Sequence, residues 1–325
     1  MKITLKCGTN FEANERSTIL DDAIENNVFL SHSCRTGQCD SCKTMVISGE
    51  TAIIRPEIAL KQKDIDAGYI LTCCRSPLSD LTLDATNLKK FSSIKKVRIP
   101  AKIFKLNQVT SSLLILDLKL HPESNFKFIP GQYIDLSRSN IKRSYSIMSF
   151  DQQNKVLRLF IKNYIHGAMS QYLFEESKVG DLLVIFGPHG TFCFEDSERS
   201  SSNLFFATGT GIAPYVSILN DLEARNIEVS ISLFWGNRYA DEFLELPDFK
   251  SIDLKVYRAL SQETKEGFYN GYIQDLFSSV DYEHITISPY ICGSKDMIEC
   301  VQNRLRESGY NGIIATDAFV SHNEG

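Results

Sequence analysis

Three closely spaced cysteines constrain this chain more than any other feature of its sequence. Cys34, Cys39 and Cys42 follow the spacing C-x4-C-x2-C, and the pair Cys73 and Cys74 comes after thirty intervening residues. Three cysteines at this spacing, with a distant fourth, are typical of a [2Fe–2S] cluster. Two irons bridged by sulfides need four thiolates. One tight loop supplies three of them, with its backbone N–H groups directed at the sulfurs, and a distant segment supplies the fourth.

The fourth ligand must be chosen between Cys73 and Cys74. Their segment reads Leu71-Thr72-Cys73-x-x-x-Pro77 and resembles the plant-type ferredoxins, in which the first cysteine of Leu-Thr-Cys-x-x-x-Pro is the ligand. The resemblance implies a metal-ligand set of Cys34, Cys39, Cys42 and Cys73, with Cys74 as a small buried neighbour. Gly37 suits the close approach of backbone to cluster. Four buried thiols or a zinc site are the alternatives, but zinc sites usually carry two C-x2-C pairs at shorter separation.

Composition narrows the class of protein. The chain has 325 residues, 43% hydrophobic and 23% charged, which suits two or three globular domains. Its net charge of −5 argues against a general nucleic-acid binder, which would show a basic face. We expect no membrane span, because no apolar run approaches roughly 20 residues, and no signal peptide, because 1–6 alternates like a strand. Nine cysteines, five of them scattered outside the ligand set, suggest free thiols in a reducing compartment and hence the cytoplasm.

Residues 1–88 are predicted to form the first domain. The pattern predicts strands at Ile3–Leu5, Lys43–Ser48 and Leu81–Asp84, a helix after Ser17-Thr18 and a second helix from Pro56 to Asp66. This order resembles the β-grasp fold of plant-type ferredoxins. Leu88–Lys96, with four lysines, is interpreted as an interdomain linker.

Residues 97–196 are predicted to be a second, all-β domain. Regular short strands separated by turn signals favour an antiparallel barrel or a sandwich, with one helix from Ala168 to Glu176. The predicted strands are Val97–Leu106, Ser112–Leu118, Tyr133–Leu136, Ser144–Met148, Val156–Ile161 and Leu182–Phe186.

Residues 202–325 change to alternating strands and helices, which predicts a doubly wound parallel sheet. The predicted strands are Leu204–Ala207, Val229–Trp235, Leu254–Ala259 and Ile285–Cys292, and the clearest helices are Ala213–Arg225 and Lys295–Ser308. The chain is thus a multidomain protein with α+β and α/β parts.

One candidate cofactor motif lies in the predicted barrel. Arg143-Ser144-Tyr145-Ser146 offers a cation, hydroxyls and an aromatic face, which are the groups that bind a flavin; the structural alternative is an edge strand with an exposed arginine. Gly167 to Ser170 opens a helix, and a helix N-terminus with Gly and Ser suits a pyrophosphate. Gly187 to Phe192 reads as a barrel-closing turn, so we expect His189 to be a surface loop residue and not a catalyst.

Two further motifs lie at strand ends in the last domain. Gly209-Thr210-Gly211-Ile212-Ala213-Pro214 joins a strand to a helix, so its glycines can admit a diphosphate at the helix N-terminus; an ordinary strand–helix turn is the alternative. Cys292-Gly293 ends a later strand, where sheets of this class bind ligands. Cys292 can therefore face a nicotinamide or be a buried core cysteine.

These motifs, in this order, resemble the ferredoxin–NADP reductase superfamily, with a ferredoxin fused at the N-terminus. The resemblance implies that Arg143 binds the flavin phosphate, Tyr145 packs on the isoalloxazine and Ser146 approaches N5, with Ser144 in the same strand. It implies further positions for FAD pyrophosphate (Gly167, Ser170), dinucleotide diphosphate (Gly209, Thr210, Gly211), nicotinamide (Cys292, Gly293) and a flavin cover (Phe319). Ser146 and Cys292 are the two predicted catalytic residues.

Two branches of the superfamily have this domain order. One contains reductase components of multicomponent oxygenases and phenol hydroxylases; the other contains CDP-6-deoxy-Δ3,4-glucoseen reductases of 3,6-dideoxyhexose synthesis. Segments such as Gly131 to Leu136 and Asp317 to Val320 resemble the second branch more. That resemblance implies electron flow from NADH through FAD and the cluster to a pyridoxamine-phosphate-dependent dehydrase. An oxygenase partner and a non-enzymatic redox carrier are the alternatives. NADPH stays open as the donor, because Arg238 can meet a 2′-phosphate or be a solvated loop residue.

Overall fold

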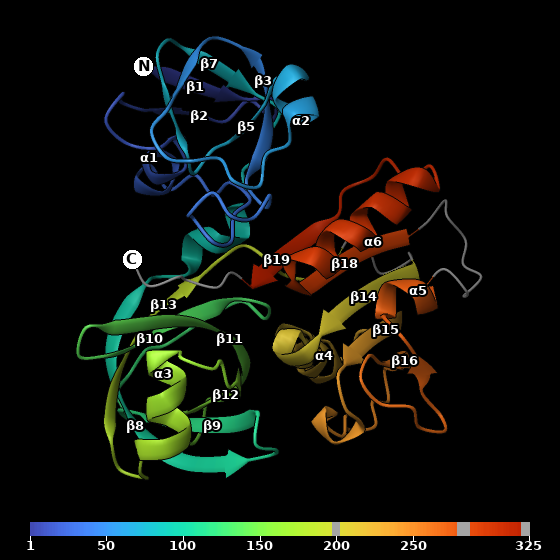
Figure 1. Cartoon of the computed structure of the whole chain (residues 1–325). Helices are drawn as coiled ribbons and strands as arrows, with labels where there is room; N and C mark the ends of the chain where they lie inside the picture. The colour runs from blue at the N-terminus through green and yellow to red at the C-terminus, as the bar shows by residue number, and fades with distance from the viewer. Residues whose placement is uncertain (197–201, 278–286, 320–325) are drawn as a thin grey trace. The chain divides into compact units, whose positions relative to one another are not determined.

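The computed structural model describes residues 1–196, 202–277 and 287–319, and divides into two compact units (Figure 1). Among the described residues, the first unit contains Met1–Ile94, Gly190–Phe192 and 316–319, and the second contains Lys95–His189 and those between Cys193 and Ala315. In the described part of the chain no helix is long and apolar enough to cross a membrane. The domain limits 1–88, 97–196 and 202–325 remain predictions.

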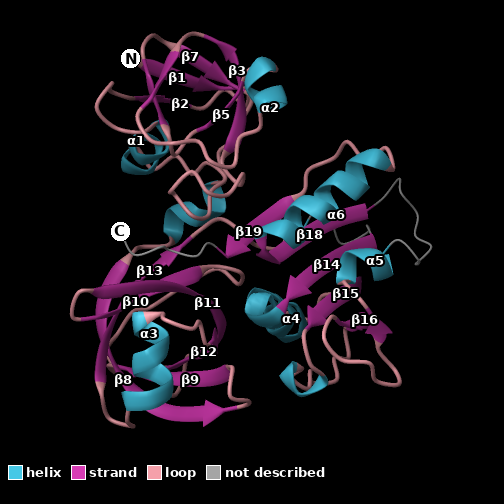
Figure 2. Ribbon diagram, viewed as in Figure 1, coloured by secondary structure: helices cyan, strands magenta, loops and turns pink. Residues whose placement is uncertain are grey.

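The first unit is built on a five-stranded sheet with the order β2-β1-β7-β3-β5, accompanied by a small sheet of β4 and β6 (Figure 2). Strand β1 pairs parallel with the central strand β7 and antiparallel with β2, which confirms the expected ferredoxin fold. The strands are β1 (Lys2–Leu5), β2 (Asn10–Glu12), β3 (Lys43–Ser48), β4 (Thr51–Ile53), β5 (Tyr69–Leu71), β6 (Arg75–Pro77) and β7 (Leu81–Leu83).

Two helices in this unit test the sequence predictions. Helix α1 (Ile19–Glu25) begins where expected, because the Thr18 hydroxyl accepts a hydrogen bond from the Asp21 amide at 3.0 Å. The predicted helix from Pro56 to Asp66 is wrong in its first half, since α2 spans only Gln62–Asp66. The amides of Ile54 and Arg55 donate to the Cys74 carbonyl, which ties the chain before Pro56 to the fourth-ligand segment, and a turn at 58–59 precedes α2. After β7, the lysine-rich segment forms a 3-10 helix (Lys89–Ser93).

The second unit begins with a closed antiparallel barrel of strand order β10-β11-β12-β9-β8-β13. All six predicted strands are confirmed, and the barrel, not the sandwich, is formed. The strands are β8 (Val97–Gln108), β9 (Leu113–Leu120), β10 (Tyr133–Arg138), β11 (Ile141–Asp151), β12 (Val156–Lys162) and β13 (Leu182–His189). The predicted helix is present as α3 (Ala168–Gln171), which continues as a π-helical turn through Tyr172–Glu176.

A buried ion pair joins β9 and β12. The Arg158 guanidinium donates to both carboxylate oxygens of Asp117, at 2.7 and 2.9 Å, and the Asp117 side chain is 5% exposed while that of Arg158 is 43% exposed. We expect Asp117→Ala to lower the free energy of unfolding by about 2 kcal/mol, because hydrogen bonds to charged groups are lost but the arginine can rehydrate.

Arg158→Ala should be the more damaging change, because it leaves a buried carboxylate without its cation. Urea denaturation of the two variants and the unsubstituted chain measures both effects. Equal midpoints for the three proteins, or a reversed order of the two variants, would contradict the account.

The nucleotide-type sheet has the order β17-β16-β15-β14-β18-β19. Its strands are β14 (Ser202–Thr208), β15 (Val229–Asn237), β16 (Ile252–Leu260), β17 (Tyr269–Asn270), β18 (Ile287–Ser294) and β19 (Ala315–Phe319). Residues 285 and 286, where the last strand was expected to begin, lie outside the described residues. The clearest predicted helices are confirmed as α4 (Ala213–Ala224) and α6 (Lys295–Glu307). A full helix does not follow every strand: only the 3-10 turn Ala240–Glu242 follows β15, and the short α5 (Ile273–Phe277) comes after β17.

Strand β14 lies between β15 and β18 and is parallel to both. The strands β15 to β17 follow on one side of β14, and the chain then crosses to the other side for β18, so the direction of strand addition reverses between β14 and β18. Ligands of doubly wound sheets bind at such a switch point, outside the carboxyl ends of the strands. The two ends here are Thr208 and Ser294, so the glycine turn after β14 and Cys292-Gly293 in β18 meet at one edge of the sheet.

Candidate functional site: a cluster loop, a flavin strand and a nucleotide turn

The four predicted iron ligands lie together in the first unit, and their sulfurs form two pairs. Cys34 and Cys39 Sγ are 3.0 Å apart, and Cys42 and Cys73 Sγ are 3.4 Å apart. Across the described residues, no group of three or more His, Cys, Asp or Glu side chains is arranged to hold a single metal ion. Two pairs of thiols fit a two-iron cluster, in which each iron takes two thiolates, better than one tetrahedral zinc.

The electrostatics of these pairs favour one thiolate in each. A hydrogen bond from Cys39 lowers the pKa of Cys34 to about 5, and hydrogen bonds from Cys42 and Cys74 lower the pKa of Cys73 to about 3. The same interactions, with burial, raise the pKa values of Cys39 and Cys42. Backbone amides also approach sulfur as expected, since the Thr36 amide donates to Cys34 Sγ at 3.4 Å. Metal ligation needs thiolates, so Cys39 and Cys42, whose pKa values are raised, must still lose their protons when a cluster binds.

Cys74 lies beside the ligand set. Its sulfur is 3.5 Å from Cys73 Sγ and donates to the Pro56 carbonyl at 3.4 Å. Gly37 packs against the Pro56 carbonyl and the Cys74 sulfur. A Cβ at this position would lie 2.1 Å from the Pro56 oxygen and 2.7 Å from Cys74 Sγ. The backbone φ of Gly37 is +75°, which also favours glycine. The glycine is therefore required by close packing of the loop against the fourth-ligand segment.

Segments distant in sequence also hold the cluster loop within the first unit. The His32 amide donates to Thr191 Oγ1 at 2.8 Å, and the Ser33 hydroxyl donates to the buried Asp317 carboxylate. Burial raises the pKa of Asp317 to about 6. The Ser41 hydroxyl donates to the Thr316 carbonyl at 3.0 Å. Sequence reasoning missed these partners, because no local spacing relates residues 191, 316 and 317 to a loop at 34–42.

The predicted flavin residues lie on β11 in the second unit. Tyr145 packs against the barrel core, and burial raises the pKa of its phenol, so the ring stays neutral. Ser146 is buried opposite Tyr133, and the Ser144 hydroxyl donates to Asp135 at 2.7 Å. A neutral aromatic ring next to a buried hydroxyl on one strand fits an isoalloxazine edge.

The predicted pyrophosphate residues at α3 are packed tightly. Ser170 Oγ accepts from the Tyr164 amide at 3.1 Å, and a Cβ on Gly167 would lie 3.2 Å from that oxygen. The Ser170 hydroxyl can still donate its own proton, and its role at a pyrophosphate stays a prediction. The expectation that His189 is a surface loop residue is wrong. It is 5% exposed at the end of β13, and its ring lies 4.9 Å from that of Phe186. The reason is that β13 continues through Gly187 and Pro188, which were predicted to form a turn.

The glycines at the switch point have different neighbours. A Cβ on Gly211 would lie 2.4 Å from the Cys292 carbonyl oxygen, and one on Gly293 would lie 2.2 Å from Thr208 Oγ1. Gly209 has φ +55° and nothing within 4 Å of its Cβ position, and its carbonyl accepts from Trp235 Nε1 at 3.2 Å. Of the three, only Gly209 borders open space that suits a diphosphate.

Thr210 and Cys292 are buried at this edge. Phe319 is half-buried at the end of β19. Its role over a flavin, like the roles of the other predicted cofactor residues, stays a prediction.

The flavin strand and the nucleotide turn lie side by side within the second unit. Helix α4 contacts β11, and the turn Gly209–Ile212 contacts β12. The N-terminus of α4, which favours anions, is therefore adjacent to the strands that carry the flavin motif. This arrangement allows a dinucleotide to deliver its reactive ring to a flavin.

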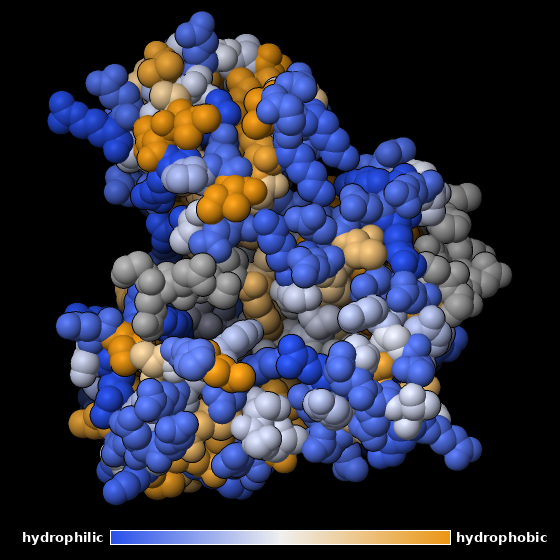
Figure 3. All heavy atoms as spheres, viewed as in Figure 1, coloured by the Kyte–Doolittle hydropathy of each residue, from blue (hydrophilic) through white to orange (hydrophobic). Residues whose placement is uncertain are grey.

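Apolar side chains reach the surface of the first unit (Figure 3). Ile53 and Ile58 are each 60% exposed, and they belong to the segment whose amides bond to Cys74. A shallow cavity in this unit is lined by Val46, Gly49, Glu50, Thr51, Ile65, Gly68, Tyr69, Ile70, Arg75 and Leu78. None of its lining residues belongs to the predicted cofactor sets, so we attach no role to it.

Models of known protein families match the N-terminal, the barrel and the C-terminal regions of the chain. Residues 4–78 match the 2Fe-2S iron-sulfur cluster binding domain, residues 100–194 the oxidoreductase FAD-binding domain, and residues 205–303 the oxidoreductase NAD-binding domain. The amycolatopsis cytochrome P450 reductase GcoB has the same fold, with a TM-score of 0.74, 23% identity and 98% of each chain covered. Fold and domain content thus define an NAD(P)H-dependent oxidoreductase with FAD and a [2Fe–2S] cluster.

Two relatives that align with nearly the whole chain show which reductases it resembles. The chain is 36% identical over 323 residues to the CDP-6-deoxy-L-threo-D-glycero-4-hexulose-3-dehydrase reductase of Yersinia pseudotuberculosis, covering 96% of each protein. It is 26% identical to the toluate 1,2-dioxygenase electron transfer component of Pseudomonas putida, covering 94% and 96%. The chain belongs to this family of iron–sulfur flavoprotein reductases, which pass electrons from NAD(P)H to a partner protein.

Proposed function

We propose that this reductase takes electrons from NADH and delivers them to the pyridoxamine-phosphate-dependent dehydrase of CDP-3,6-dideoxyhexose synthesis. The observation that carries the choice is the 36% identity to a dehydrase reductase along nearly the whole of both chains. An oxygenase is the second candidate acceptor, supported by the 26% identity to a dioxygenase component over a similar length.

The proposed site residues divide by cofactor. Bound FAD would supply the chemistry that links two-electron hydride transfer from NADH to one-electron transfer to the [2Fe–2S] cluster. Cys34, Cys39, Cys42 and Cys73 hold the cluster. Tyr145 supplies a neutral ring against the flavin, and Ser146 a hydroxyl near its reacting edge.

The switch point positions the second nucleotide. The Gly209–Ile212 turn and the N-terminus of α4 bind the diphosphate, while Cys292 and Gly293 line the nicotinamide side. The chain itself needs no proton donor for hydride transfer. Its contribution is to place two rings within reach and exclude water.

A coupled assay tests the acceptor. The reconstituted protein and NADH are mixed without oxygen with the dehydrase, pyridoxamine phosphate and CDP-4-keto-6-deoxyglucose, and 3-deoxygenated sugar is measured. Overall, replacing C–OH by C–H takes up two electrons and two protons and releases water, so one product should form per NADH oxidised.

The assay has a clear negative outcome. If NADH reduces cytochrome c rapidly but no deoxygenated sugar forms, the electron acceptor is an oxygenase or another protein and not the dehydrase. Omitting the reductase is the control, since product must depend on it. Replacing NADH by NADPH in the same mixture tests the proposed donor, and faster product formation with NADPH would overturn that choice.

A further inference from the structure

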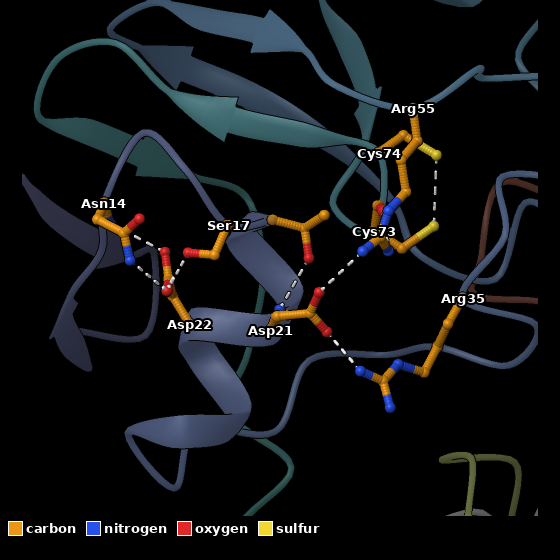
Figure 4. Close-up of polar contacts among 9 residues, drawn as sticks. Asn14, Ser17, Asp21, Asp22, Arg35, Arg55, Cys73 and Cys74 are labelled. Carbon is orange, nitrogen blue, oxygen red and sulfur yellow. Dashed lines mark hydrogen bonds and ion pairs between the residues drawn. The ribbon is translucent and has the colours of Figure 1, made fainter.

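One carboxylate in the first unit contacts two arginines beside the cluster cysteines (Figure 4). Asp21 lies in the first turn of α1, where its amide bonds to Thr18. Its Oδ1 accepts from Arg35 Nη2, and its Oδ2 lies 3.5 Å from Arg55 Nη2. Partial burial opposes ionisation, but the Thr18 hydroxyl and the two guanidinium groups hold the pKa of Asp21 below its usual value.

The two arginines belong to different halves of the ligand set. Arg35 follows Cys34 directly and has φ +58°, a left-handed conformation that needs support from its surroundings. Arg55 Nη1 donates to the Cys73 carbonyl at 3.4 Å, and its amide donates to the Cys74 carbonyl at 3.0 Å. One arginine therefore adjoins the Cys34–Cys39 pair and the other adjoins the Cys42–Cys73 pair.

We propose that Asp21 is a positioning residue that holds Arg35 and Arg55 beside the two halves of the ligand set and thereby sets the reduction potential of the cluster. A single carboxylate on a capped helix connects the loop with the fourth-ligand segment. The three side chains carry a net charge of +1. Because reduction adds one negative charge to the cluster, nearby fixed guanidinium groups favour the reduced form.

Removal of the Arg55 charge tests the electrostatic part. In the full-length holoprotein, Arg55→Gln should make the cluster about tenfold harder to reduce, which is about 59 mV more negative for one electron. The potential is read from the EPR signal of the reduced cluster during a titration with dithionite. Arg55→Lys keeps the charge and should stay within about threefold of the unsubstituted protein.

A double-mutant cycle tests the positioning part. If Asp21 holds Arg55 in place, Arg55→Gln should have a much smaller effect, under about threefold, when Asp21→Asn is already present. Lys6→Gln is the matched control, because Lys6 is an exposed lysine paired with Asp84 and should shift the equilibrium by less than about twofold. The titration uses no acceptor protein, so its result does not depend on the proposed function.

Two results would overturn the inference: no change of potential in Arg55→Gln, or an equal effect of Arg55→Gln with and without Asp21. Iron content is measured first for every variant. If Asp21→Asn does not retain iron, the cycle is run with Asp21→Glu, which keeps the charge but changes the reach of the carboxylate.

Discussion

Cys73→Ser is expected to abolish the [2Fe–2S] cluster while NADH still reduces the flavin. The Cys73 sulfur is 3.4 Å from that of Cys42, so its position completes the second pair of ligands. Serine supplies a much poorer iron ligand, and iron content should fall below about a tenth of the normal value. NADH-to-ferricyanide transfer should stay within about twofold, because the flavin residues of β11 and the Gly209–Ile212 turn lie in another unit.

Cys74→Ser is the matched control. The Cys74 sulfur donates to the Pro56 carbonyl, and a serine hydroxyl can make the same bond. We expect the cluster absorbance, the iron content and the reduction of cytochrome c to be retained. Loss of the cluster in Cys74→Ser, with retention in Cys73→Ser, would exchange the roles of the two cysteines.

Local chemistry explains which features the sequence could predict. The cysteine spacing, the Thr18 cap and the Gly209–Gly211 turn each depend on residues a few positions apart. The six barrel strands were also predictable, because each is a short run rich in apolar residues bounded by turn residues. Even the meeting of two motifs at the switch point followed from the rule that parallel strands end at one edge.

Long-range contacts explain the errors. Residues from Pro56 have helical composition, but Ile54 and Arg55 bond to Cys74, residues 58 and 59 form a turn, and the helix begins only at Gln62. The Ser33–Asp317 and His32–Thr191 bonds join residues 284 and 159 positions apart. Strands β4 and β6 were missed because three residues give no measurable period. In each case tertiary pairing outweighed local preference.

The glycine turn shows how one motif can serve two purposes. Sequence alone assigned both Gly209 and Gly211 to the nucleotide diphosphate. The structure separates them: Gly211 lies under the Cys292 carbonyl, while Gly209 borders open space. A glycine required by packing and one required by a ligand look the same in a sequence, and only the neighbouring atoms distinguish them.

Gly211→Ala is therefore expected to destabilise the second unit and to slow NADH oxidation. The new Cβ would lie 2.4 Å from the Cys292 carbonyl oxygen and 3.0 Å from its carbon. Both are backbone atoms of β18, so the strand ends must separate, at about 3 kcal/mol of unfolding free energy. A shift of this kind at the switch point should lower kcat/KM for NADH by about a hundredfold.

Gly209→Ala distinguishes packing from ligand binding at the same turn. Its Cβ meets no atom, so only the left-handed backbone opposes it, by about 1–2 kcal/mol. In this variant the main effect should be a KM for NADH raised about tenfold, because the methyl group enters the space assigned to the diphosphate. Urea denaturation and steady-state kinetics on both variants measure the contrast. Equal unfolding midpoints for Gly211→Ala and the unsubstituted chain would show that β18 yields easily, and an unchanged KM in Gly209→Ala would place the diphosphate elsewhere.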